Sequence, residues 1–195
     1  MLVDYFEKHG VDMDKIQHIP VISLEDCAVK MLQTYDMLVK AKKEYEEDPA
    51  NNDDVRVLVV LDSIGALSSD KLINDAVKKD QMVADMGSSA KLRNNLMRGL
   101  MMRVPISGAT LLIINHVYDD PSALFGASKI KQMGGGKGLE YASHLILQCE
   151  KLLVKAGNDE FLVGGEEKDS DQGNFYKGNR LRFFVVKNRI SKPAF

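Results

Sequence analysis

The first regular pattern of apolar positions covers residues 24–46. Ser23, followed three residues later by Asp26, resembles a helix N-terminal capping box, and apolar side chains then recur every three or four residues. An amphipathic helix is therefore predicted over this range. A turn-rich acidic connection follows, and the Val/Leu run within residues 56–62 predicts a strand that is buried on both faces.

A second helix-then-strand pattern follows a mostly polar stretch from residue 68 to 87. Leucines at every fourth position from Leu92 to Leu100 mark a second amphipathic helix, which we expect to end near Pro105. The apolar residues within 109–116 then predict a second buried strand. Two such repeats favour an α/β fold with a mostly parallel sheet and crossover helices.

The C-terminal part of the chain has a different pattern. Three strand-like segments, at residues 142–154, 160–165 and 180–190, predict antiparallel β-hairpin strands added at one edge of the sheet. The length of 195 residues suits a single core, and nothing in the sequence divides it. We therefore expect residues 1–195 to form one domain.

Composition argues against several classes of protein. The net charge of −2 and the pI of about 6.1 give no global attraction to nucleic acid, so any such binding has to come from local patches. No apolar run approaches the length of a membrane span, and the first residues lack the pattern of a signal peptide, so we expect a cytoplasmic protein without membrane contact. Cys27 and Cys149 are isolated, which argues against a disulfide framework and a zinc site.

Polar side chains come directly after both predicted strands. Asp62 and Ser63 follow the first strand, and Asn115 and His116 follow the second. In open parallel sheets ligands bind outside the carboxyl ends of the strands, which share one rim. An acid beside a magnesium-nucleotide and a polar group that reaches the terminal phosphate are parts that phosphoryl transfer needs. The residues alone leave open the alternative that each polar side chain merely caps its strand.

The segment from residue 117 to 138 is long and rich in glycine, as functional loops often are. Its GGGKG sequence fails as a Walker A phosphate loop, because Lys131 stands where the first glycine belongs and Gly138 where Ser or Thr belongs. A nucleic-acid backbone suits it better, since glycine N–H groups and nearby lysines can both approach phosphates. The residues concerned are Lys129, Lys131, Lys137, Gly134, Gly135 and Gly136.

One face of the second predicted helix carries only cations and amides. Its residues, spaced three or four apart and opposite the leucines, are Lys91, Asn94, Asn95 and Arg98. Solvated faces usually carry acids as well, so this composition favours an anionic partner. An ordinary solvated face stays the simpler alternative.

Lys187 and Arg189 form a second pair of cations, two residues apart within the last predicted strand. This spacing predicts that both side chains emerge on one side of the strand. Paired cations can clamp a phosphate, although an edge strand also carries lysine simply to block aggregation.

Six segments in order resemble the ATPase core of RecA-type DNA strand-exchange recombinases, and most closely the bacteriophage members. They are YFEKHGVDMDKI, VLVVLDSIGAL, DMGSSAKLRNNLMRGL, LLIINHVY, MGGGKGLEYAS and VVKNRISKPAF, and they run through nearly the whole chain. Each is weak alone, but the six together are specific. The resemblance implies a RecA-like P-loop ATPase core that lacks the N-terminal phosphate-loop unit.

The resemblance implies a nucleotide site with ATP and Mg²⁺ as cofactors. Asp62 matches the Walker B acid that orients Mg²⁺ through water, and Ser63 is its usual neighbour. His116 matches the position that senses the terminal phosphate and relays the nucleotide state to the second DNA-binding loop. Tyr5 falls where an aromatic residue packs on adenine.

The resemblance also implies contacts with DNA. Residues 74–87 match the first DNA-binding loop, with Met86 in the place of an apolar wedge between bases. Lys91, Asn94 and Arg98 match DNA-backbone contacts. The phosphate cradle of the second DNA-binding loop falls on Gly134, Gly135 and Gly136.

The function that this resemblance implies is ATP-dependent DNA recombination and repair, in the cytoplasm of a phage-infected bacterium. The protein would bind single-stranded DNA as a homo-oligomeric filament and pair it with double-stranded DNA. Lys187 and Arg189 match cations that reach the ATP of the adjacent subunit. Two alternatives are a RecA-fold helicase and a non-enzymatic regulatory paralogue that binds DNA or a recombinase.

The resemblance places the family's phosphate loop and catalytic glutamate before the first residue of this sequence. We therefore expect the chain alone not to hydrolyse ATP, because the β- and γ-phosphates would lack their main ligands. The sequence would be a truncated piece, a partial gene, or one half of a split gene with a companion fragment that carries the phosphate loop.

Overall fold

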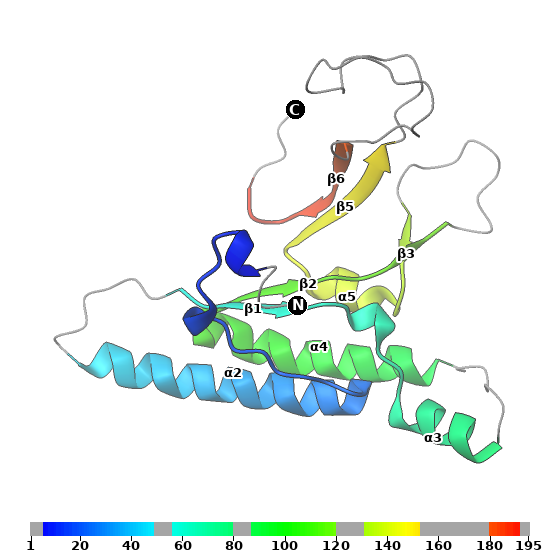
Figure 1. Ribbon diagram of the computed structural model, residues 1–195, viewed down its shortest axis with the longest axis horizontal. Coiled ribbons are helices and arrows are strands. Elements are labelled where there is room, and N and C mark those ends of the chain that lie inside the picture. The colour runs from blue at the N-terminus through cyan, green and yellow to red at the C-terminus, as the bar shows by residue number, and fades with distance from the viewer. Residues whose placement is uncertain (1–5, 49–55, 80–86, 120–130, 153–179, 192–195) are drawn as a thin grey trace. The chain divides into compact units, whose positions relative to one another are not determined.

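The computed structural model of the chain describes residues 6–48, 56–79, 87–119, 131–152 and 180–191 (Figure 1). The chain divides into two compact units. The first unit comprises residues 1–116 and 133–142, and the second comprises residues 117–132 and 143–195. That all 195 residues act as one domain stays a prediction.

Helix α2, Leu24–Glu47, confirms the first predicted helix of the first unit. The hydroxyl oxygen of Ser23 accepts the amide N–H of Asp26 (3.1 Å), and the Asp26 carboxylate accepts the amide N–H of Ile22 (3.1 Å). A hydrogen bond from Lys30 to this carboxylate (2.9 Å) lowers the pKa of Asp26. The buried side chains of α2 are spaced three or four residues apart and are Leu24, Cys27, Met31 and Tyr35.

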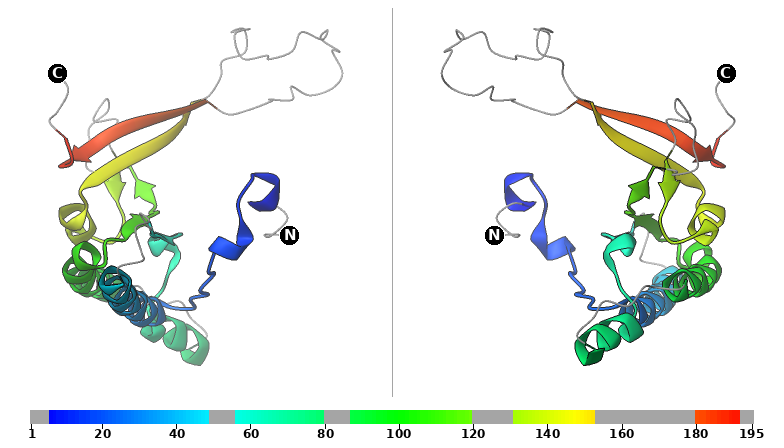
Figure 2. Two further views of the ribbon diagram at one scale, coloured as in Figure 1. Left: turned by 90° about the vertical axis from the view of Figure 1, so that its left-hand side faces the viewer. Right: turned by 90° about the vertical axis from the view of Figure 1, so that its right-hand side faces the viewer.

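Strands β1, Leu58–Leu61, and β2, Thr110–Ile113, form a parallel pair in which Leu61 lies opposite Ile113. Both predicted strands are confirmed. One face of this pair packs on the layer of α2 and α4 (Figure 2), through the side chains of Val59, Leu61, Leu111 and Ile113. The other face is open within the described part of the chain, where it exposes Leu58, Val60 and Leu112. The expectations that the first strand is buried on both faces and that the second strand is buried are therefore wrong for the residues described.

Helix α4, Ser88–Ser107, confirms the second predicted helix and packs against α2. Its core side chains include Leu96, Met97 and Leu100. The helix runs two residues past Pro105 and stops at Gly108, whose φ of +70° is a left-handed conformation that favours glycine. An ion pair of 2.7 Å between Arg103 and Asp36 also joins α4 to α2.

Helix α3, Asp70–Lys79, lies in the polar stretch where no element was predicted. Its start is fixed by Ser69, which is buried and accepts the amide N–H of Leu72 (3.4 Å). The N–H of Asp70 donates to Glu25 of α2 (2.9 Å). Residues 74–79, the beginning of the matched first DNA-binding loop, are therefore helical, and residues 80–86 lie outside the described residues.

The glycine-rich segment 117–138 is more regular at its ends than predicted. It begins with β3, Val117–Tyr118, and later contains β4, Gln132–Met133, which pairs with β3 in a two-stranded sheet. Helix α5, Lys137–Ala142, then starts within the segment and buries Leu139 in the core of the first unit. The first unit also contains two short 3₁₀ helices, η1 at Met13–Lys15 and η2 at Ile64–Ala66.

The second unit contains the predicted antiparallel hairpin. Strand β5, Leu145–Leu152, pairs with β6, Arg180–Asn188, and a register shift falls between Ile146 and Leu147. Among the residues that the structure describes, these two strands pair only with each other, so the expectation that they extend the edge of the parallel sheet is not borne out there. Residues 160–165, which were also predicted as a strand, lie outside the described residues.

Candidate functional site

The carboxyl ends of β1 and β2 meet at one point, as the sequence predicts. The amide N–H of Ile114 donates to the carbonyl of Leu61 (2.9 Å), and the amide N–H of Ile64 donates to the carbonyl of Ile114 (3.1 Å). Parallel pairing thereby brings the segment that carries Asp62 and Ser63 beside the segment that carries Asn115 and His116. The peptide bond between Asp62 and Ser63 is cis.

Ser63 and His116 are close enough to interact. The Ser63 hydroxyl lies 3.4 Å from Nε2 of His116, and which of the two donates depends on the tautomer of the imidazole. The His116 side chain is exposed, as is that of Asp62. Both are therefore accessible to a ligand at the strand ends, and this edge has the residue types expected for a nucleotide site.

Asn115 connects this edge to the three glycines Gly134–Gly136, which we call the glycine segment. Its side-chain amide donates to the carbonyl of Gly134 (2.8 Å), and the amide N–H of Gly134 donates to the carbonyl of His116 (3.1 Å). The side-chain oxygen of Asn115 accepts the amide N–H of His116 (2.9 Å). The sequence shows an amide at the strand end, but not its bond to a residue 19 positions away.

The glycine segment has a backbone conformation typical of loops that a ligand can approach closely. Gly135 and Gly136 have φ values of +91° and +84°, which glycine adopts without the penalty other residues meet. A Cβ on Gly135 would lie 2.8 Å from Cδ of Arg93. The guanidinium of Arg93 donates to the carbonyl of Leu67 (3.0 Å), so this residue joins α4 to the chain after η2 and packs on the glycine segment. Sequence reasoning did not single out Arg93.

The predicted polar face of α4 is only partly open. Lys91 and Arg98 are exposed, as the phosphate-contact prediction requires. Asn94 is half-buried, because it lies against α5 where a Cβ on Gly138 would collide with its side chain. Lys91 also lines a groove of about 350 Å³ between the first turns of α2, α3 and α4, together with Lys71 and Glu25.

The remaining lysines of the glycine-rich segment have distinct positions. Lys137 is the first residue of α5 and is exposed. Lys131 belongs to the second unit, where its ammonium group pairs with Asp119 (3.2 Å) and its amide N–H donates to the side chain of Gln148 (2.8 Å). A phosphate contact by Lys131 would compete with that ion pair.

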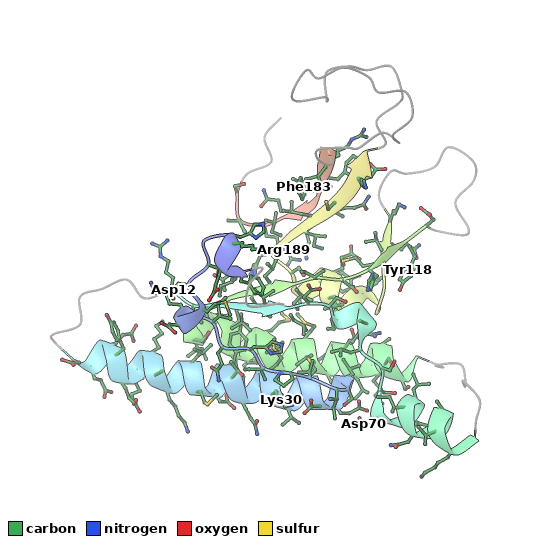
Figure 3. All side chains as sticks on the ribbon, in the orientation of Figure 1. Asp12, Lys30, Asp70, Tyr118, Phe183 and Arg189 are labelled. Atoms are coloured by element: carbon green, nitrogen blue, oxygen red, sulfur yellow. The ribbon has the colours of Figure 1, made fainter. Side chains whose placement is uncertain are left out.

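Lys187 and Arg189 both belong to the second unit. Lys187 is half-buried near the end of β6, opposite Ile146. Arg189, labelled in Figure 3, lies one residue beyond the strand and is exposed, and its amide N–H donates to the carbonyl of His144 (2.8 Å). The strand alternation on which the sequence-based pairing depended therefore ends between the two residues.

Three predicted site residues lie outside the described residues: Tyr5, Met86 and Lys129. In the part of the chain that is described, no three His, Cys, Asp or Glu side chains gather as a metal-binding group. The magnesium prediction therefore depends on Asp62, which is exposed at the strand end and suits coordination through water.

The fold and this strand-end edge are compatible with a RecA-like core, with its parallel strands, glycine segment and antiparallel hairpin. No family model matches the chain. The chain is 29% identical to the recombination and repair protein of Enterobacteria phage T4 over 155 residues, which are 80% of this chain and 35% of that protein. It is 26% identical to the RecA proteins of Mycobacteroides abscessus and Nocardia farcinica over 196 residues, which are 97% of this chain and 44% of each relative.

These relatives support a RecA-family recombinase and a general role in DNA recombination and repair. The chain spans less than half the length of the relatives it matches. Among the helices that the structure describes, none has the length and apolar character needed to cross a membrane.

Proposed function

We propose that the chain is a central part of the ATPase core of a recombinase like the bacteriophage protein UvsX. It coats single-stranded DNA as a homo-oligomeric filament and exchanges strands with homologous double-stranded DNA in the cytoplasm of a phage-infected bacterium. The observation that carries this proposal is the connection at the strand ends, from Ser63 through His116 and Asn115 to the glycine segment. One end of this connection suits a nucleotide and the other suits a DNA backbone.

At the nucleotide end, Asp62 would hold Mg²⁺ through water, and His116 would contact the terminal phosphate. Bound ATP and Mg²⁺ would supply the phosphoryl chemistry, while the chain's own residues would orient the nucleotide and sense its terminal phosphate. Ser63, whose hydroxyl lies 3.4 Å from Nε2 of His116, would help to orient the ring. Tyr5 would pack on adenine, and Lys187 with Arg189 would reach the nucleotide of an adjacent subunit.

At the DNA end, Lys91 and Arg98 would contact phosphates from the exposed face of α4. The positive φ values of Gly135 and Gly136 turn the backbone in a way that lets N–H groups approach a phosphate closely. Other DNA contacts in this proposal are Met86, Asn94, Lys129, Lys131, Gly134 and Lys137.

A binding assay tests this proposal. Fluorescent single-stranded DNA and ATP are offered to the 195-residue chain, alone and mixed with a companion fragment that carries a phosphate loop. We expect ATP binding and DNA-stimulated hydrolysis with the companion only. DNA binding without turnover under any condition would indicate a regulatory paralogue, and no DNA binding under any condition would contradict the proposal.

A further inference from the structure

Gly65, in η2, is a glycine whose backbone does not require glycine. Its φ is not among the positive values found in the described residues, so an alanine there would meet no left-handed strain. The obstacle is space. A Cβ on Gly65 would lie 2.7 Å from the side-chain oxygen of Asn115 and 2.7 Å from Cδ2 of His116, closer than real Cβ contacts come. The space that a methyl group on Gly65 would need is therefore occupied by the side chains of Asn115 and His116, which follow β2.

Both the oxygen and the nitrogen of the Asn115 side-chain amide form hydrogen bonds. The oxygen accepts the amide N–H of His116 (2.9 Å), and the nitrogen donates to the carbonyl of Gly134 (2.8 Å). The amide N–H of Gly134 returns a hydrogen bond to the carbonyl of His116 (3.1 Å). The backbone of His116 and the start of the glycine segment are therefore joined in both directions, and Asn115 makes one of the two links.

The ring of His116 is exposed, so burial does not fix its position. The Ser63 hydroxyl lies 3.4 Å from Nε2 of the ring, and a Cβ on Gly65 would lie 2.7 Å from its Cδ2. A displacement of the His116 backbone would move Gly134, because the two share a direct hydrogen bond and the Asn115 bridge.

We propose that Asn115 is a positioning residue that holds His116 and the glycine segment at a fixed separation, and that Gly65 is required to leave room for both. The effect on DNA binding rests on the proposed function, in which His116 senses the nucleotide. The positioning itself is a property of the chain without ligands. It is therefore tested on the 195-residue chain with no nucleotide or DNA present.

The first test replaces the donor of the bridge while keeping its shape. Asn115→Asp retains an oxygen that can accept from His116 but cannot donate to Gly134, and Gln33→Glu, the same amide-to-carboxylate change at an exposed position of α2, is the control. Amide hydrogen exchange of Gly134 is measured relative to that of Met31 in the buried stripe of α2, so that any global loss of stability cancels. Loss of one hydrogen bond predicts a relative rate about fivefold higher in Asn115→Asp only. An unchanged ratio would overturn the proposal.

The second test concerns the space at Gly65. Gly65→Ala is compared in the wild-type background and in a background that already carries Asn115→Ala and His116→Ala, which removes both obstructing side chains. Overpacking predicts that Gly65→Ala raises the unfolding equilibrium constant about tenfold in the first background and little in the second. Equal effects in both backgrounds would show that Gly65 does not make room for these residues, and would overturn that part of the proposal.

A third measurement separates this inference from the proposed function. Single-stranded DNA affinity is compared with ADP and with a non-hydrolysable ATP analogue, in the presence of the phosphate-loop companion. Asn115→Asp should reduce the wild-type ratio of affinities, while Gln33→Glu leaves it unchanged. If the wild type shows no difference between nucleotides, the proposed function fails, whereas the exchange and stability results still decide the positioning role. If the wild-type ratio persists in Asn115→Asp, the bridge does not carry the coupling.

Discussion

Tyr35 shows how much a single side chain contributes to the core of the first unit. It is fully buried in α2, and its hydroxyl has no hydrogen-bond partner among the described residues. A buried hydroxyl without a partner costs free energy, so Tyr35→Phe should leave the free energy of unfolding unchanged or raise it by about 1 kcal/mol. Tyr35→Ala, the control, should lower it by about 3 kcal/mol or more. Urea unfolding of the three proteins measures this, and a clear loss in Tyr35→Phe would indicate an unseen partner.

The same substitution should alter stability at high pH. Burial raises the pKa of Tyr35 to about 12, whereas an unfolded tyrosine has a pKa of about 10. Between these values the unfolded chain has lost a proton that the folded chain keeps, so stability falls as pH rises from about 10 to about 12. Tyr35→Phe should show less of this loss than the wild type. Parallel curves for the two proteins across this range would contradict it.

Lys91 and Arg98 test whether the open face of α4 contacts phosphates. Each removed phosphate contact should lower the slope of log affinity against log salt concentration by about 0.7 for single-stranded DNA, with little dependence on sequence. We therefore expect Lys91→Ala and Arg98→Ala to weaken DNA binding and reduce this slope. Lys40→Ala, at an exposed position on α2, is the control. If slope and affinity stay at wild-type values, the face is ordinary solvated surface.

The sequence predicts residues whose role follows from their position along a strand, and misses those whose role depends on a distant contact. The position of Asp62 and His116 at neighbouring strand ends could be predicted because they directly follow apolar runs, while their roles stay predictions. Arg93 could not, because its partners are the carbonyl of Leu67 and the glycine segment. Gly65 could not either, since the need for a glycine there comes from side chains about 50 positions further along the chain.

At the scale of elements, the start of α2 is determined locally. Ser23 is buried and caps the helix through its hydroxyl, so Ser23→Ala should lower the free energy of unfolding by about 1 kcal/mol. Ser68→Ala is a matched control, because Ser68 is exposed and contacts α2 through its backbone carbonyl, which accepts the N–H of Leu24 (2.9 Å). Thermal unfolding measures both. Equal effects would mean that the hydroxyl of Ser23 adds nothing as a cap.

The predicted elements are confirmed where a helical stripe or a continuous run of apolar residues specifies them. Helices α2 and α4 and strands β1 and β2 fall in this group. Helix α3 was missed because it is short and mostly polar, and its start depends on Ser69 and on the bond from Asp70 to Glu25. The hairpin of β5 and β6 was predicted, but its sheet was not, because alternation along a strand does not specify which strand is its neighbour.

At the scale of the whole molecule, the proposed filament predicts that active sites form between subunits. Lys187 and Arg189 belong to a different compact unit from Asp62, and in our proposal they act on the nucleotide of a neighbour. A cation supplied in trans to transferring phosphate can be worth on the order of 10³ in rate. With the companion present, the double variant Lys187→Ala/Arg189→Ala should therefore lose DNA-stimulated turnover, as should Asp62→Asn.

Mixing these two inactive proteins should restore part of the turnover. A mixed interface would pair an intact Asp62 on one subunit with intact cations on its neighbour. If the two proteins assemble together on DNA and no mixing ratio restores activity, the cations act within their own subunit or only support the hairpin.

The central claim is that the strand-end edge couples a nucleotide to DNA, and one comparison tests it most directly. The affinity of the chain with its companion for single-stranded DNA is measured with ADP and with a non-hydrolysable ATP analogue, for the wild type and for His116→Ala. The account predicts that the wild type binds DNA more tightly with the ATP analogue, and that His116→Ala still binds DNA but with equal affinity in both states. A wild-type difference that persists undiminished in His116→Ala would contradict the account.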